Sequence, residues 1–202
     1  MIDKYDPSCL RIIIKKETNW DDIIHKKLYG FNEIIVKKTE NYFIPIKSKF
    51  LDFWGISEEQ LWKDAEEINS QIIIKSIKNA LEAILGEKSD TKGQECDDDF
   101  FVVSNKDALF GASALLLSNN LEAVSKFVGG SFYAIPSSIH EWLILPVTRY
   151  QDISKGFGAM IRDINSSCVA EKERLDNQPY LYDAEMKRFG RLYQSTKGLL
   201  SQ

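Results

Sequence analysis

Apolar positions in the first thirty residues follow two different spacings. Residues 10–14 form a short β-branched run followed by charged residues, which is typical of a buried strand. In residues 20–28 the apolar side chains recur every three or four positions, the spacing of an amphipathic helix. Asn19 is placed to cap this predicted helix and Gly30 to end it.

The next two apolar runs predict a β-hairpin. Residues 33–38 and 42–47 are rich in β-branched and aromatic side chains, and a polar triplet at 39–41 separates them. Pro45 lacks a backbone N–H, so we expect the second strand to lie at a sheet edge or a bulge.

Two helices are predicted before the middle of the chain. Ser57 and Gln60 have the spacing of a capping box, in which the serine hydroxyl accepts a backbone N–H and the glutamine side chain reaches back. The apolar stripe of this helix consists of Leu61, Trp62, Ala65 and Ile68. Residues 69–70 are expected to end it before a second amphipathic helix over 72–85.

The second half of the chain contains further predicted strands and helices. Residues 87–99 are polar and acidic without apolar periodicity, so we expect an exposed loop there. Short apolar runs predict strands over 100–104, 111–118, 132–135 and 139–147, with a turn at 136–138. The remaining predictions are helices over 121–128 and 152–170 and a terminal extended or hairpin segment over 180–192.

These elements together predict an α+β fold with a mixed, mostly antiparallel sheet and flanking helices. A length of 202 residues and 44% hydrophobic content favour a single domain over residues 1–202. The loop at 87–99 is the best internal boundary, and it leaves open a division into lobes 1–86 and 100–202.

Nothing in the sequence predicts export, a membrane span or a bound cofactor. No apolar stretch approaches the length of a membrane-spanning helix, and the N-terminus lacks the layout of a secretory signal. Cys9, Cys96 and Cys168 match no zinc or redox spacing, so we expect reduced thiols in a cytoplasmic protein. Gly156 and Gly158 lack the third glycine of a dinucleotide-binding loop.

Charge is distributed unevenly, although the net charge is only -4. Residues 1–50 carry 10 basic and 7 acidic side chains, residues 51–100 carry 5 and 13, and residues 101–202 carry 11 and 10. The acidic run at 97–99 has the oxygen ligands of a divalent-cation site, but no histidine or EF-hand spacing accompanies it. We therefore expect a solvated loop without a bound metal.

The segment at 136–141 combines the side chains of acid–base chemistry. Imidazole titrates near neutral pH, and hydroxyls and a carboxylate adjoin it, so the candidate catalytic residues are His140, Glu141 and Ser138. Strand neighbours point to opposite faces, so His140 is expected to share a face with Ser138 and Trp142 rather than pair with Glu141. The alternative is that the serines bond the backbone at a corner while His140 packs against Trp142.

Two charged segments are candidate binding surfaces. The helix that Ser57 begins presents a set of carboxylates that can mimic nucleic-acid phosphate, namely Glu58, Glu59, Asp64, Glu66 and Glu67. The tail interleaves aromatic rings with cations that suit phosphate contact and base stacking, namely Lys187, Arg188 and Arg191. Solvated or edge-protecting charge would produce the same two patterns.

Four strings in the chain resemble a known family. They are LDFWGISEEQL at 51–61, FGAS at 110–113, YAIPSSIHE at 133–141 and VAEKERLD at 169–176. Their order and spacing over about residues 31–183 are similar to those of the uncharacterised bacterial family called domain of unknown function 5688. The chain resembles a member shortened at its N-terminus, since its first thirty residues depart from the pattern. The resemblance implies a fold but no chemistry, and it also implies an association with mobile-element proteins that counter CRISPR defence.

Three functions are open from the sequence. The first is a binding protein that docks onto a protein or ribonucleoprotein through its acidic helix, such as a phage- or plasmid-encoded inhibitor of CRISPR-type defence. The second is a nuclease-like hydrolase of RNA with His140 as general acid or base. The third is a housekeeping protein-interaction module.

Overall fold

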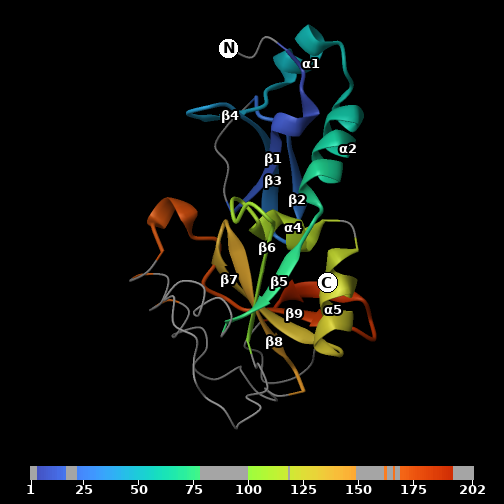
Figure 1. Cartoon of the computed structure of the whole chain (residues 1–202), viewed down its shortest axis with the longest axis vertical. Coiled ribbons are helices and arrows are strands. Elements are labelled where there is room, and N and C mark those ends of the chain that lie inside the picture. Colours follow the sequence, from blue (N-terminus) through green and yellow to red (C-terminus); the bar gives the residue numbers. More distant parts are fainter. Residues whose placement is uncertain are drawn as a thin grey trace.

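The computed structural model describes residues 4–16, 22–77, 100–117, 119–148, 162, 166 and 169–192. These residues form one sheet of four strands and one of six, with helices packed beside them (Figure 1). All strand pairs in both sheets are antiparallel. The predicted α+β class with a mostly antiparallel arrangement is therefore confirmed, with two sheets in place of one.

The four-stranded sheet contains the first half of the chain. Its central strand β3 (Phe31–Lys38) lies between β1 (Leu10–Lys15) and β2 (His25–Leu28), and β4 (Phe43–Pro45) pairs with the far end of β3. The strand predicted at 10–14 and the hairpin of β3 and β4 are confirmed. Among the described residues β4 pairs with β3 alone, so Pro45 lies in an edge strand as predicted.

The helix predicted over 20–28 is wrong where the structure describes it. His25–Leu28 is strand β2, while residues 20 and 21 lie outside the described part of the chain. Tyr29 and Gly30 both have positive φ angles, 51° and 85°, which is the geometry of a two-residue hairpin turn. This turn sets Leu28 opposite Phe31, so pairing with β3 overrides the local helical spacing.

Two helices follow the four-stranded sheet, α1 (Ser48–Trp54) and α2 (Glu58–Asn69). Gly55, in the left-handed region at φ 67°, ends α1. The Ser57 hydroxyl accepts the N–H of Gln60 at 3.1 Å, which confirms the predicted start of α2. Gln60 does not complete the capping box, because its side-chain amide donates to Asp64 Oδ1 instead, at 2.7 Å.

The six-stranded sheet has the order β10-β9-β7-β8-β6-β5. Its strands are β5 (Ile73–Ser76), β6 (Phe101–Ser104), β7 (Phe132–Ser138), β8 (Glu141–Pro146), β9 (Tyr180–Asp183) and β10 (Arg188–Arg191). The predicted strand at 100–104, the hairpin of β7 with β8 and the terminal hairpin of β9 with β10 are confirmed. So is helix α5 (Asn120–Val128), which ends at Gly129 in the left-handed region.

Three predictions for the chain after α2 are wrong, the first of them over part of its length. The helix predicted over 72–85 is wrong at residues 73–76, which are strand β5 because Ile73 and Ile74 pair with β6; Ile77 is helical, and residues 78–85 lie outside the described part of the chain. The strand predicted over 111–118 is helix α4 (Ala112–Leu116), which is buried on every side and so shows no polar face. The turn predicted at 136–138 belongs to β7, with a register shift there, and the turn itself is Ile139 and His140.

Several other predictions fall outside the described residues. They are the loop at 87–99 with its acidic run, the glycines at 156 and 158, Cys96 and Cys168, and nearly all of the helix predicted over 152–170. Within the described ranges, no helix is long and apolar enough to cross a membrane.

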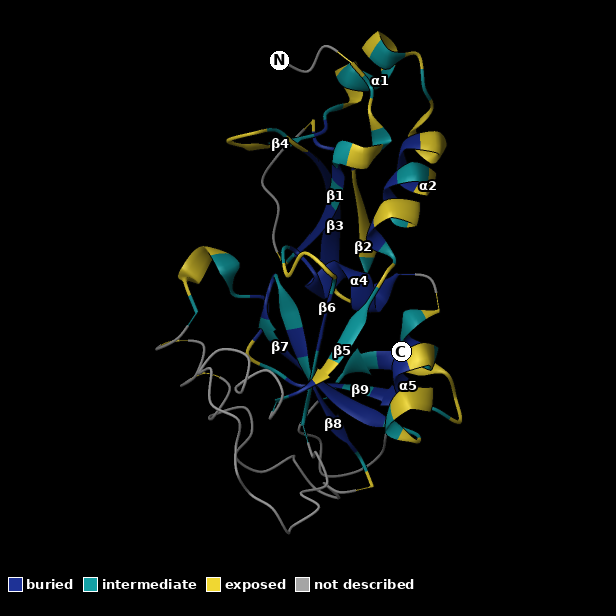
Figure 2. Cartoon of the chain, viewed as in Figure 1, coloured by how far each residue is buried: buried dark blue, intermediate teal, exposed yellow. Residues whose placement is uncertain are grey.

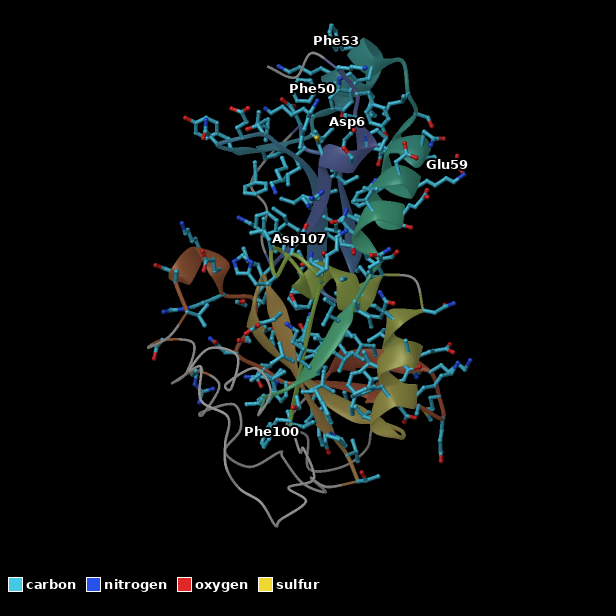
Figure 3. The ribbon with its side chains drawn as sticks, in the orientation of Figure 1. Asp6, Phe50, Phe53, Glu59, Phe100 and Asp107 are labelled. Atoms are coloured by element: carbon cyan, nitrogen blue, oxygen red, sulfur yellow. The ribbon has the colours of Figure 1, made fainter. Side chains whose placement is uncertain are left out.

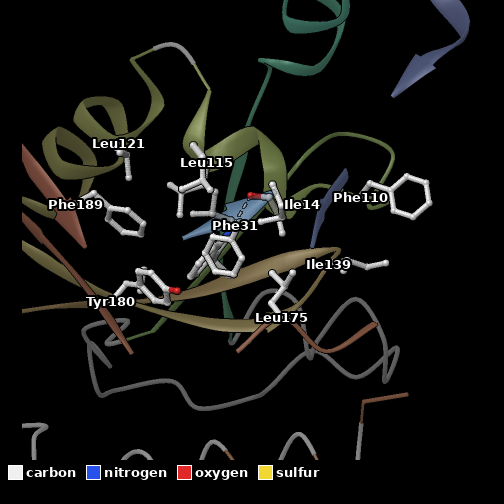
Figure 4. Close-up of a cluster of buried hydrophobic side chains, with 14 of the residues drawn as sticks. Ile14, Phe31, Phe110, Leu115, Leu121, Ile139, Leu175, Tyr180 and Phe189 are labelled. Atoms are coloured by element: carbon white, nitrogen blue, oxygen red, sulfur yellow. Dashed lines mark hydrogen bonds between the residues drawn. The ribbon is translucent and has the colours of Figure 1, made fainter. Parts of the chain in front are cut away.

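A buried cluster joins the two sheets. Phe31 of β3 stacks on Tyr180 of β9 with ring centroids 5.4 Å apart (Figure 4). Phe31 also meets Trp142 of β8 edge-on, with ring centroids 5.9 Å apart. A second cluster lies under α2, where Leu61 and Trp62 pack on the four-stranded sheet. Figure 2 shows the result, with buried strands at the centre of each sheet and an exposed outer side on α2. Ile68 of α2 was predicted in the apolar stripe but is 42% exposed.

Candidate functional site

The turn between β7 and β8 fixes the backbone of His140 against three other segments. The Ser104 hydroxyl at the end of β6 donates to His140 O at 2.8 Å. The N–H of Ala112 in α4 donates to Ile139 O at 3.3 Å, and the N–H of Ile139 donates to Glu173 O at 2.8 Å. We call this junction the His140 corner; it consists of Ser104, residues 110–112, the turn Ile139–His140 and Glu173.

The imidazole of His140 is held as tightly as its backbone. Its ring stacks on Phe110, with centroids 5.6 Å apart and an interplanar angle of 15°. The backbone N–H of Phe110 donates to His140 Nδ1 at 3.1 Å, so the neutral ring carries its proton on Nε2. Phe110 itself has φ 56°, a conformation that bulky residues rarely adopt, and these two contacts hold it there.

Gly111 allows the segments of the corner to approach this closely. A Cβ atom at this position would lie 2.7 Å from His140 O and closer still to Ser104 Oγ. Since real Cβ atoms are not found so near other heavy atoms, glycine is required here by space rather than by its backbone angles.

Glu173 is the carboxylate that lies beside the His140 imidazole, and the sequence did not indicate it. Nε2 lies 3.9 Å from Glu173 Oε2, whereas Glu141 accepts the Ser137 hydroxyl at 3.4 Å. The Ser138 hydroxyl accepts the backbone N–H of His140 at 3.1 Å, which is the role proposed in the structural alternative. Nδ1 already accepts the Phe110 N–H, so the neutral ring has no free acceptor nitrogen in this arrangement, and the 3.9 Å between Nε2 and Glu173 Oε2 is beyond hydrogen-bond distance.

Sequence reasoning missed Phe110, Gly111 and Glu173, which lie about thirty positions from His140 in either direction. A signal for them did exist, because three of the four strings that resemble the family contain the parts of this corner. Those strings are 110–113, 133–141 and 169–176. The fourth string, 51–61, holds Gly55 and Ser57, which set the end of α1 and the start of α2.

Three of the five acidic side chains of α2 are held by other side chains of the protein, and the other two are exposed. Glu58 accepts Trp62 Nε1–H at 3.2 Å, Asp64 accepts the Tyr5 hydroxyl at 2.5 Å, and Glu66 forms an ion pair with Lys26 at 3.2 Å. Glu59 and Glu67 are exposed, and Figure 3 shows Glu59 pointing away from the body of the protein.

The predicted cations of the tail lie in or beside β10 and are mostly paired within the chain. Lys187 forms an ion pair with Glu122 of α5 at 3.1 Å, and Arg191 forms one with Asp176. Arg188 is exposed. The tail therefore offers fewer cations to a phosphate chain than its sequence indicates.

Asp176 is a buried centre that sequence reasoning did not single out. Besides Arg191, its carboxylate accepts the Tyr180 hydroxyl at 3.1 Å, the Asn177 N–H at 2.7 Å and Lys16 Nζ at 3.2 Å. Burial acts to raise the pKa of Asp176, but the hydrogen bond and charge of Arg191 outweigh it, so the pKa is lowered. Because Lys16 follows β1 and Arg191 lies in β10, this ionised carboxylate ties the two sheets together.

Within the described residues no group of three or more histidine, cysteine, aspartate or glutamate side chains is arranged to hold a metal ion.

None of the curated proteins and none of the solved structures matches the chain. One family matches residues 31–184, about three-quarters of the chain, and it is described as a family of unknown function, DUF5688. The match covers the whole His140 corner and the strands from β3 to β9, and leaves out β1, β2 and β10. The chain therefore belongs to the family of unknown function DUF5688.

Proposed function

We propose that the chain is a binding protein that docks through α2 onto a basic surface of a protein or ribonucleoprotein. The observation that carries this proposal is the charge of α2, whose twelve residues contain five carboxylates and one lysine. The difference, five minus one, gives a net charge of −4 on a single helix, equal to that of the whole chain.

The held carboxylates favour binding because their positions are fixed. Trp62, Tyr5 and Lys26 each fix one carboxylate of α2, so a partner would not have to order these side chains on docking. Asp64 and Glu67 are three positions apart, so they lie about one helical turn from each other, and Glu59 and Glu66 are seven positions apart, about two turns. This concentration of negative charge on one helix suits a channel lined by lysine and arginine that otherwise holds nucleic-acid phosphate.

The finer form of the proposal is that the partner is an RNA-guided effector of a CRISPR-type defence system. The phosphate-like charge of α2 supports it, because such effectors hold nucleic acid in positively charged channels. Inhibition by occupation of that channel needs no catalytic residue.

The experiment measures binding of the purified chain to a panel of purified RNA-guided nucleases, with and without guide RNA, and inhibition of DNA or RNA cleavage. We expect binding that weakens as salt concentration rises, and we expect the double variant E59K/E67K to lose most of it. The matched control is E40K/E185K, which changes the net charge equally at exposed sites away from α2. Equal loss in both double variants, or no binding by the wild type, would reject α2 as the docking surface.

Hydrolysis of RNA by His140 is the alternative, and it has its own test. We expect no products when the wild type is incubated with RNA, with or without Mg²⁺, because the imidazole contacts of the His140 corner serve the fold. If products do appear and His140→Ala abolishes them in a folded protein, the hydrolase replaces the binding protein as the better proposal.

A further inference from the structure

Glu33 is a carboxylate in an unusual place. It lies in the central strand β3, its residue is 3% exposed, and no hydrogen-bond partner of its Oε1 atom is found among the described residues. Buried polar atoms are nearly always paired, and a buried unpaired negative charge is costly. The Glu33 carboxylate therefore has two states to compare, a neutral protonated one and an ionised one that needs a positively charged partner.

One lysine lies within reach of two carboxylates at this point. Lys26 of β2 is directly opposite Glu33 in the antiparallel pairing, so both side chains are on the same face of the sheet, the face that α2 covers. The Lys26 ammonium is 3.2 Å from Glu66 Oε1 of α2 and 4.1 Å above the Trp62 ring. On the other side of β3, the residue opposite Glu33 is the uncharged Ile14 of β1.

We propose that Glu33 and Glu66 compete for Lys26, so that Glu33 acts as a proton-controlled switch of the charge on α2. When Glu33 is protonated it is neutral, and Lys26 neutralises Glu66. When Glu33 releases its proton to solvent water, the new buried charge draws Lys26 inward across the strand pair. Glu66 is then left without its partner on the exposed side of the helix.

The position of this equilibrium is near neutral pH. Burial raises the pKa of Glu33 to about 7, with the charge of Lys26 acting to lower it and that of Glu66 acting to raise it. Lys26 and Glu66 are the charged groups that act on Glu33 from β2 and α2, and β1 contributes none opposite it. A change of about one pH unit around neutrality would thus change the charge pattern of α2.

The consequence for binding rests on the proposed function. A basic partner would meet one more unpaired carboxylate on α2 above the pKa of Glu33 than below it. The switch itself is a property of the free chain, so it is tested without any partner, and its failure is distinct from failure of the docking proposal.

The test is an NMR titration of the free chain that follows the side-chain carboxyl carbons of Glu33 and Glu66 and the Nζ of Lys26. We expect Glu33 to titrate near neutral pH and the signals of Glu66 and Lys26 to move with the same midpoint. In Glu33→Gln, which keeps the size of the side chain, this shared step should vanish from Glu66 and Lys26. In Glu59→Gln, which alters an exposed carboxylate of the same helix, it should remain.

Two results would overturn the proposal. One is a Glu33 midpoint at the ordinary value of a glutamate. The other is a raised Glu33 midpoint that neither Glu66 nor Lys26 senses, which would leave Glu33 as a buried acid without a switch. If Glu33→Gln does not fold, Lys26→Met tests the proposal in its place. Without the lysine, the Glu66 signal should lose the step that it shares with Glu33, and Glu33 should titrate at a higher pH than in the wild type.

Discussion

Replacing Glu33 by glutamine removes a titratable group from the core while keeping nearly the same shape. The perturbation is therefore electrostatic, and its effect on the free energy of unfolding must depend on pH. Any cost of burying the glutamine amide is the same at every pH. It cancels when the difference between wild type and variant is compared at two pH values.

The size of the effect follows from the two pKa values of Glu33. In the folded chain the pKa is about 7, against 4.5 for an unperturbed glutamate, a separation of about 2.5 pH units. One pH unit of separation corresponds to about 1.4 kcal/mol, so the titration of this one side chain accounts for up to about 3 kcal/mol. This is a large part of the total free energy of unfolding of a folded protein, which is typically about 5 to 15 kcal/mol.

The direction is opposite to that of most acidic residues. Because the folded chain holds the proton more tightly, the unfolded chain binds fewer protons between pH 4.5 and about 7. The stability that the neutral Glu33 allows is fully present below pH 4.5, falls through this window, and stays low above pH 7. Glutamine does not titrate, so the variant lacks this loss.

The assay is urea-induced unfolding of wild type and Glu33→Gln at about pH 5 and about pH 8. The free energy of unfolding of Glu33→Gln, relative to that of the wild type, should rise by about 2 to 3 kcal/mol from the lower to the higher pH. Glu59→Gln, on the exposed side of α2, should show no such gain. A difference between wild type and Glu33→Gln that is equal at both pH values would refute the assignment of a raised pKa to this carboxylate.

Two further predictions concern the packing of the fold and are read from the same unfolding experiment. Gly111→Ala should destabilise the chain by about 2 kcal/mol or more, because the added methyl group meets His140 O and Ser104 Oγ. Gly190→Ala, with open space around it, should change the free energy of unfolding little. Equal effects of the two variants would contradict the close packing at Gly111. Arg191→Met should cost about 3 kcal/mol by leaving the buried Asp176 short of a partner, while exposed Arg188→Met should stay within about 0.5 kcal/mol. A loss at position 188 as large as at 191 would contradict the role of the ion pair.

Local signals predicted the parts of this fold that local chemistry determines. The β-branched run of β1, the serine that begins α2 and the glycine that ends α5 act within a few residues, and each was identified correctly. The failures lie where a distant partner decides. Residues 73–76 are a strand because β6 is available to pair with them, and α4 is buried on all sides, so neither its length nor its polarity indicates a helix.

The candidate site shows the same limit. His140 was identified from its own segment, but its partners were not, because Phe110 and Glu173 reach it through the fold rather than along the chain. The alternation of strand side chains argued against pairing His140 with Glu141, but no local pattern pointed to Glu173, which is remote along the chain. The family strings gave better guidance, since three of them meet at one corner.

The two charged regions of the molecule differ in how their charges are balanced. Asp176 is surrounded by Arg191, Lys16, Tyr180 and a backbone N–H, so removing any one contact leaves the others, and its ionisation is fixed. Among the described residues Lys26 is the one cation that acts on Glu33, and it is already paired with Glu66. A charge with many partners stabilises one structure, whereas two carboxylates that share one lysine permit two arrangements. This difference in partner number is why regulation is expected at α2 and not at the buried tie between the sheets.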